Sequence, residues 1–360
     1  MIEKGRIAAV GRKVSLPEDA KIIEADGLHV FPGLIDAGTT LGLTEIDKVA
    51  DYADTGLFRP DLRAGVAVNP DSALIPVARA GGVTTVLIVP KIGIISGQAS
   101  LVSLAGWTAP DMTLQLEAGL AIQWPGGKSA KERVEQLRQF VHRARLYDRV
   151  RSVKKPSVSL DPRLEAMRPY LRGERPVLVE ATSRKQIAEA LLFAEKEKLR
   201  LVLVGAADAW KLAPELKKRK VPVILGPVMR DPVAEYDPFD ASYANAGRLY
   251  EAGVRFCFRS DSATNSRNVP FEAAMAVAYG LPQRDALRAL TLSAAEILGV
   301  ADQLGSITPG KQATLIVTDG SPLQPSTQIK AVFIRGQPFA PRSRHTKLFR
   351  RYLRRLNELR

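Results

Sequence analysis

The chain has 360 residues, of which 46% are hydrophobic and 25% are charged, and this balance excludes a disordered chain or a fibrous repeat. Its single cysteine, Cys257, excludes a scaffold of intrachain disulfides. The formal net charge is +14, but eight Lys or Arg residues and one Glu lie within residues 340–360, which is half of that excess. The body of the chain is only mildly basic, so a nucleic-acid partner is not expected.

Apolar runs rich in Val, Ile and Leu recur at long intervals, which is typical of parallel strands buried on both faces. The segments between them, such as 183–199 and 208–219, have apolar residues at three- and four-residue spacing and predict helices. This alternation predicts an α/β fold with a (β/α)8 TIM barrel. We expect Cys257 to be buried in the last strand rather than to be a reactive thiol. The predicted strands are 30–35, 84–89, 114–122, 177–180, 201–204, 221–225 and 254–258.

The two ends of the chain have a different pattern, with short strands bounded by Gly, Pro and Asp. These segments predict a small composite β-sandwich domain formed by both chain ends. The predicted strands are 5–11, 21–24, 313–318 and 329–336. The predicted domains are 1–30, the N-terminal part of the sandwich; 31–303, the barrel; 304–339, the C-terminal part of the sandwich; and 340–360, a basic amphipathic helix.

Within the last segment, residues 347–359 place Leu, Phe and Tyr side chains on one helical face and Lys and Arg elsewhere. We expect this helix to dock its apolar face on its own domain and to leave its charges in solvent. Binding to an anionic surface is the alternative.

The sequence contains no run of 18 apolar residues and therefore predicts no transmembrane helix. Residues 1–6 lack the apolar stretch of a signal peptide, so a cytoplasmic location is the default expectation.

The three histidines, His29, His142 and His345, lie in separate and unrelated segments. Metal-binding spacings such as H-x-H and H-E-x-x-H are absent from the sequence. A histidine-rich metal centre is therefore not expected, and we predict no bound metal or other cofactor.

Two motifs near the start of the chain and one near its end are distinctive. Residues 23–27 read Ile-Glu-Ala-Asp-Gly, residues 31–36 read Phe-Pro-Gly-Leu-Ile-Asp, and residues 305–315 read Gly-Ser-Ile-Thr-Pro-Gly-Lys-Gln-Ala-Thr-Leu. These motifs resemble the amidohydrolase superfamily, in particular imidazolonepropionase and related cyclic-amide hydrolases. The resemblance implies a TIM barrel in which zinc or another divalent metal activates a water that hydrolyses carbon–nitrogen bonds other than peptide bonds. It also implies further strands before Gly5, so an upstream start and export stay open.

The ligands that the resemblance implies are an H-x-H pair after the first barrel strand, a Lys or Glu on the fourth, histidines after the fifth and sixth, and an Asp after the eighth. In this chain the H-x-H positions are Gly38 and Thr40, the fifth-strand position is Glu180, and the sixth is Gly205. Asp261 matches the expected aspartate. Glycine has no ligand atom and a threonine hydroxyl is a poor zinc donor, so these replacements predict a degenerate metal site.

Three functions stay open on this sequence. The favoured one is a pseudoenzyme that acts as a binding or partner subunit, either as a homo-oligomer or with an active paralogue. The second is a surviving hydrolase of a cyclic amide or related small molecule that uses Asp261 and Glu180, with a weak metal or as a metal-free acid–base pair. The third is binding of an anionic surface or nucleic acid through residues 340–360.

Two side chains near the predicted barrel mouth have alternative roles. Without a metal, we expect Asp261 to hydrogen-bond the loop 262–265. Lys91 follows the predicted strand 84–89, where it either stays solvated or meets an anion.

Overall fold

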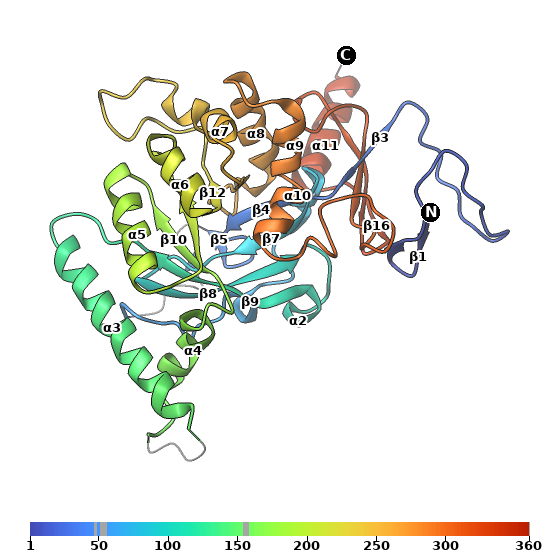
Figure 1. Ribbon diagram of the computed structural model, residues 1–360. Coiled ribbons are helices and arrows are strands. Elements are labelled where there is room, and N and C mark those ends of the chain that lie inside the picture. Colours follow the sequence, from blue (N-terminus) through green and yellow to red (C-terminus); the bar gives the residue numbers. More distant parts are fainter. Residues whose placement is uncertain (47–48, 51–55, 154–157, 360) are drawn as a thin grey trace.

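The computed structural model describes residues 1–46, 49–50, 56–153 and 158–359. Eight strands form one sheet that curves into a nearly closed barrel, in the order β13-β12-β11-β10-β9-β8-β7-β4, with helices around it (Figure 1). The predicted α/β barrel is thereby confirmed. The barrel strands are β4 (Leu34–Thr39), β7 (Val83–Ile88), β8 (Ile95–Ser103), β9 (Thr113–Gln123), β10 (Val177–Ala181), β11 (Leu201–Gly205), β12 (Val223–Leu225) and β13 (Phe256–Phe258).

β8 departs from the regular alternation of strand and helix, because it pairs antiparallel with both β7 and β9. The remaining barrel strands run parallel to one another, as the ladders from β9 to β13 and from β4 to β7 show. The sequence analysis did not predict β8 as a strand. Its sequence, Ile-Ser-Gly-Gln-Ala-Ser-Leu-Val-Ser, has buried polar residues where strands such as β11, β12 and β13 have a short apolar run.

Helices cover the outside of the barrel, and some of them begin at a side-chain cap. Ser183 starts α5 with a capping box to Gln186, and Asp161 accepts backbone N–H groups at the start of α4. The helices are α1 (Leu74–Ala80), α2 (Ala109–Met112), α3 (Ala130–Arg151), α4 (Pro162–Leu171), α5 (Arg184–Lys196), α6 (Ala213–Arg219), α7 (Ala241–Glu251), α8 (Val269–Ala278), α9 (Gln283–Ala289), α10 (Leu292–Ile297) and α11 (Arg344–Glu358).

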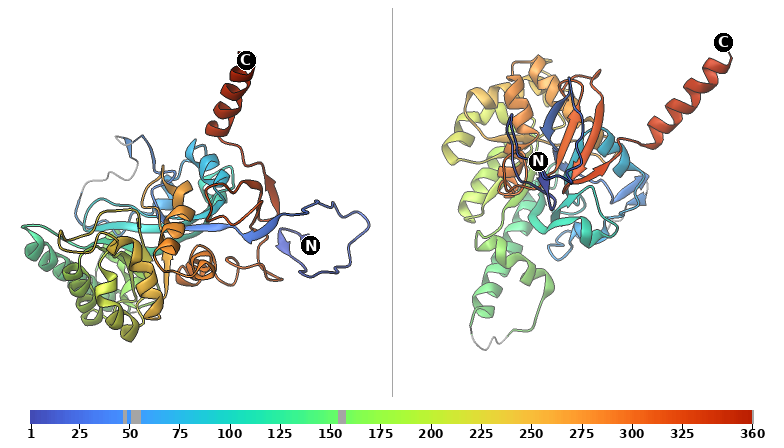
Figure 2. Two further views of the ribbon diagram at one scale, coloured as in Figure 1. Left: turned by 90° about the horizontal axis from the view of Figure 1, so that it is seen from above. Right: turned by 90° about the vertical axis from the view of Figure 1, so that its right-hand side faces the viewer.

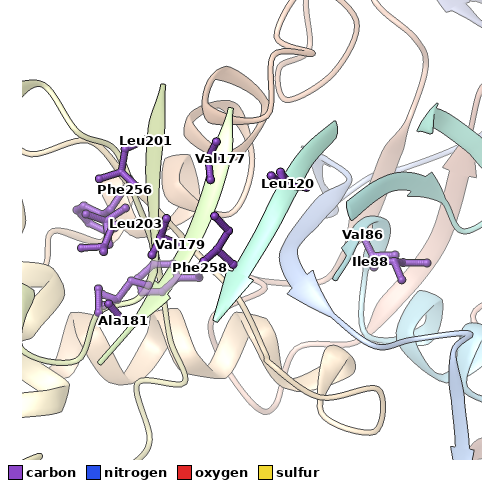
Figure 3. Packing of buried hydrophobic residues seen from close by; sticks show 14 of the residues in the cluster. Val86, Ile88, Leu120, Val177, Val179, Ala181, Leu201, Leu203, Phe256 and Phe258 are labelled. Atoms are coloured by element: carbon purple, nitrogen blue, oxygen red, sulfur yellow. The ribbon is translucent and has the colours of Figure 1, made fainter. Parts of the chain in front are cut away.

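Successive residues of the barrel strands pack into two different apolar clusters. Val177 and Val179 of β10 belong to a cluster that also contains the buried faces of the surrounding helices (Figure 3). Leu178, between them, belongs to a second cluster together with Val202, Cys257 and alternate residues of the other strands. Since side chains alternate across a strand, this second cluster fills the interior of the barrel. Cys257 is fully buried there, as predicted.

The smaller sheet unites both ends of the chain, as expected. β3 (His29–Pro32) pairs with β14 (Leu315–Thr318), which continues through β15 (Ile329–Ile334) to β16 (Gln337–Phe339), all antiparallel. A short hairpin of β1 (Ile2–Glu3) and β2 (Arg6–Ile7) lies beside it through a bridge from Arg6 to Gln312. A further two-stranded sheet joins β5 (Thr44–Ile46) to β6 (Val49–Ala50).

The prediction of a strand over residues 21–24 is wrong. These residues are part of an exposed connection that leads from Gly11 to Leu28, and Ile22 and Ile23 are 65% and 55% exposed. Apolar character alone suggested a strand, but no ladder of the described structure includes this segment.

The prediction that the C-terminal helix docks on its own domain is also wrong. Figure 2 shows α11 projecting from the small sheet into solvent, and none of its described side chains is buried. Its contact with the described part of the body lies near its first turn, where Arg267 Nη1 lies 3.0 Å from Nδ1 of His345. In the part of the chain that the structure describes, no helix combines the length and apolarity needed to cross a membrane.

Candidate functional site

Four of the candidate residues gather at one rim of the barrel. Gly38 lies near the end of β4, Glu180 near the end of β10, Gly205 at the end of β11, and Asp261 shortly after β13. These strands are parallel, so their carboxyl ends meet at the same mouth, where barrel enzymes place their sites. Thr40 is buried at the turn that follows β4, where its carbonyl accepts the N–H of Leu43.

The side chain of Arg259 connects the candidate carboxylates. Its Nη2 donates to Glu180 Oε1 at 2.7 Å, and its Nη1 lies 3.0 Å from Asp261 Oδ1. Its Nε donates to the carbonyl of Gly226 at 2.9 Å. The Arg259 side chain is only 3% exposed, so the whole guanidinium is held inside the mouth by two carboxylates and a carbonyl. A planar guanidinium suits this arrangement because its donors point in fixed directions.

Three glycines leave the space that Arg259 occupies. A Cβ on Gly38 would lie 2.9 Å from Arg259 Cδ, and a Cβ on Gly205 would lie 3.1 Å from Arg259 Nη2. A Cβ on Gly226 would come within 2.5 Å of the Arg259 carbonyl oxygen. Two of these glycines stand at positions where the family resemblance implies histidines. The absence of those side chains and the presence of the buried arginine are therefore spatially linked.

Lys91 adds a second cation on the other side of Asp261. It follows β7, and its Nζ lies 2.7 Å from both Oδ1 and the backbone carbonyl of Asp261. Lys91 is therefore paired with a carboxylate of this chain rather than fully solvated. The expectation that the Asp261 side chain hydrogen-bonds the loop 262–265 is wrong, because its carboxylate faces these two cations instead. The N–H of Ser262 donates to Ser260 Oγ, and Ser262 Oγ lies 3.0 Å from Thr264 Oγ1.

The neighbouring charges keep both Glu180 and Arg259 ionised. Burial alone would raise the pKa of Glu180, but the charge and hydrogen bond of Arg259, helped by Lys91, lower it to about 2. Burial alone would lower the pKa of Arg259, but the charges of Glu180 and Asp261 raise it above its ordinary value. Glu180 is thus an anion at neutral pH, and a carboxylate with so low a pKa is a weak base.

Asp36 is a further buried acid that the sequence analysis did not single out for a role. Its Oδ1 accepts the N–H of Ser260 at 2.9 Å, and its Oδ2 accepts the Ser260 hydroxyl at 2.6 Å. Together with the bond from Asp261 N to Gly38 O, at 2.9 Å, these contacts join the exits of β4 and β13, the two ends of the nearly closed sheet. Burial raises the pKa of Asp36 to about 6, although the hydrogen bonds from Ser260 oppose that change.

Sequence reasoning also missed Arg259, the residue at the centre of the site. The available signal was its place directly after the buried Phe256-Cys257-Phe258 run, where a charged side chain needs a partner of opposite charge. The nearby Asp261 was the evident partner, while the contact to Glu180, far away in sequence, required the fold.

The histidines lie on separate elements, as the sequence indicated. His29 is on β3, His142 on α3 and His345 on α11. Among the residues that the structure describes, no three His, Cys, Asp or Glu side chains converge in a way that could hold a metal ion. Burial raises the pKa of the Cys257 thiol, which makes this cysteine a poor nucleophile.

Comparison with known proteins places this barrel in a family. The model of the amidohydrolase family matches residues 163–339. Amidohydrolase tasK of Hapsidospora irregularis is 24% identical over 90% of this chain, which spans 38% of that protein's length. Imidazolonepropionase of Symbiobacterium thermophilum is 26% identical over 87% of this chain and 81% of its own length.

A solved structure matches nearly the whole fold. The amidohydrolase from Thermotoga maritima MSB8 superposes with a TM-score of 0.84, at 26% sequence identity and with 94% of each chain covered. The likeness covers both the barrel and the small sheet built from both chain ends, since 94% of this chain is matched. This chain belongs to the amidohydrolase superfamily.

Proposed function

We propose that this protein is a member of the superfamily without a catalytic metal centre, and that it acts as a binding or partner subunit. One observation carries the proposal: the buried guanidinium of Arg259 lies between Glu180 and Asp261, in space left by Gly38 and Gly205. The mouth of the barrel thereby holds two cations, Arg259 and Lys91, paired with two carboxylates, Glu180 and Asp261, in place of a set of free metal ligands.

The donor set argues against zinc at this position. Gly38 and Gly205 have no ligand atoms, and the two carboxylates already face Arg259 and Lys91. A divalent cation placed between these carboxylates would meet a fixed guanidinium in a buried setting, where repulsion between like charges is strong. Zinc also prefers imidazole or thiolate ligands, which the described residues of this rim do not offer.

A second candidate is hydrolysis of a carbon–nitrogen bond in a cyclic amide, the class that the name of the imidazolonepropionase relative suggests. It is favoured by the convergence of Glu180 and Asp261 on one guanidinium. Against it stands the pKa of Glu180, lowered to about 2, because a general base works best with a pKa near the working pH.

A hydrolysis assay separates the two candidates. The purified chain is incubated with hydantoin, dihydrouracil and imidazolonepropionate, with and without added Zn²⁺ or Mn²⁺. We expect no turnover above that of a Glu180→Gln/Asp261→Asn double variant. Turnover by the wild-type chain that disappears in the double variant would contradict the proposal and favour the surviving hydrolase.

The partner is part of the same proposal. A subunit without its own catalysis is expected to act with another chain, either a second copy or an active relative. Light scattering after size exclusion gives the mass of the purified chain alone and after co-expression with an amidohydrolase from the same genome. We expect at least one of the two samples to have the mass of an oligomer.

A further inference from the structure

The exposed helix α11 projects away from the body of the protein. Ser343 is buried and starts the helix with a capping box to Thr346, so its first turn is fixed. Beyond that turn the helix extends into solvent (Figure 2). Phe349 is 68% exposed and Leu356 is 51% exposed, which is unusual for such large apolar side chains.

The two faces of α11 have opposite character. At 100° per residue, the apolar side chains fall on one arc and the cations on the remaining surface. Glu358 is the acidic residue of the helix, and it lies on the cationic side. The apolar stripe consists of Leu348, Phe349, Tyr352, Leu353, Leu356 and Leu359, and the cations are Arg344, Lys347, Arg350, Arg351, Arg354 and Arg355.

We propose that α11 binds the surface of an anionic lipid bilayer, with its apolar stripe in the acyl boundary and its cations at the lipid phosphates. A helix with a strongly basic polar face and a large apolar face has this property, because burial of the stripe and attraction to anionic lipids act together. The charge of the chain points to the same partner, since half of its net +14 lies in residues 340–360.

Charge argues against a second copy of the same helix as the partner. Arg355 follows Leu348 by one heptad, and Arg350 precedes Leu353 by one turn, so cations border the stripe on both edges. Two such stripes packed together would place arginines opposite arginines, and like charges at these flanking positions disfavour pairing.

The apolar stripe argues against nucleic acid. A phosphate backbone would use the cations of α11 but would leave Leu353 and Leu356 exposed to water. Single-stranded nucleic acid is bound by stacking on aromatic side chains, whereas this stripe is mostly leucine. A bilayer buries the apolar stripe of the helix and also supplies anionic partners for its cations.

Vesicle flotation with the full chain tests the proposal. The vesicles contain phosphatidylcholine alone or phosphatidylcholine with one quarter phosphatidylglycerol. We expect binding to the anionic vesicles only, and a clear loss of binding in high salt. Arg350→Gln/Arg354→Gln should weaken binding more than tenfold, because each cation near an anionic surface contributes about fivefold.

A second variant tests the apolar stripe. Leu353→Ser/Leu356→Ser should weaken binding at least tenfold while leaving the fold intact, since both side chains are exposed. Thermal unfolding followed by circular dichroism checks that intactness. The matched controls are Trp107→Ser, which removes a 94% exposed aromatic elsewhere, and Arg133→Gln/Arg149→Gln, which removes two exposed cations of α3. We expect both controls to bind like the wild type.

Several results would overturn the proposal. Equal binding to uncharged vesicles would remove the role of the cations, and full binding by the leucine variant would remove the role of the stripe. Tighter binding to single-stranded RNA than to the vesicles, unchanged in the leucine variant, would assign the helix to nucleic acid. A wild-type dimer that the leucine variant converts to a monomer would assign the stripe to contact between copies.

Discussion

A Cβ placed on Gly38 would lie 2.9 Å from Cδ of Arg259, so the glycine and the arginine depend on one another. Gly38 stands where the family resemblance implies a histidine, and Arg259 fills the space that such a side chain would need. The same arginine pairs with Glu180 and Asp261, and Lys91 supplies the second cation that balances these two acids. The glycine at residue 38 and the buried cation of Arg259 are thus two parts of one arrangement.

The first prediction concerns Gly38→Ala. The added methyl group would force Arg259 to shift against its fixed partners. We therefore expect the free energy of unfolding to fall by about 1–3 kcal/mol. Urea denaturation measures the change. Gly11→Ala is the control, because a Cβ there meets nothing closer than 3.8 Å and the residue is exposed. Equal stability of the two variants would show that the site tolerates a side chain at residue 38.

The second prediction concerns Arg259→Met. Removing the guanidinium leaves Glu180 without its main partner in a partly buried site, and such a broken pair costs about 3–5 kcal/mol. Adding Glu180→Gln should restore part of that loss, since the neutral amide needs no counter-charge. A double-mutant cycle in urea measures the coupling. Purely additive effects would contradict the assigned ion pair.

The third prediction concerns acid pH and Glu180. Its pKa falls from 4.5 to about 2 on folding, so its stabilising contribution is present above about pH 4.5 and is lost as the pH falls toward 2. By linkage the full contribution is about 3 kcal/mol. The unfolding free energies of wild type and Glu180→Gln should therefore converge as the pH is lowered. A constant difference between pH 7 and pH 3 would show that the pKa is not lowered.

The fourth prediction has the opposite sign and concerns Asp36. Its pKa is raised from 3.8 to about 6, so the stabilisation that comes from its bound proton is present below about pH 3.8 and is lost as the pH rises through 6. Asp36→Asn mimics the protonated acid. Its stability relative to wild type should increase between pH 4 and pH 7, which chemical denaturation across that range measures. A flat difference would contradict the raised pKa.

The fold was predictable where one apolar face or run dominates the sequence. The strands 177–180 and 201–204 were found because their Val and Leu runs are continuous, and β10 and β11 overlap them closely. β8 was missed because its interior includes the buried polar residues Ser96, Gln98 and Ser100, and the partners of Gln98 and Ser100 are brought to them only by the fold. Gln98, for example, donates to Pro60 O and accepts from the Tyr170 hydroxyl.

The candidate positions at the rim were predictable, but the ion pairs that connect them were not. Gly38, Glu180, Gly205 and Asp261 could be located because the end motifs and strands fix the register of the chain. The central role of Arg259 depends on a contact with Glu180 across the barrel, and such a contact is not visible in local sequence. The docking predicted for α11 failed because amphipathicity shows that a face needs a partner but not which surface supplies it.

The central claim is that the barrel mouth is filled by ion pairs and holds no catalytic metal. Elemental analysis of the untagged protein, after incubation with excess Zn²⁺ and exhaustive dialysis, tests this most directly. The account predicts zinc, iron, manganese and nickel far below one ion per chain. Zinc that stays bound in near-stoichiometric amount in the wild type, and is lost in Glu180→Gln/Asp261→Asn, would contradict it.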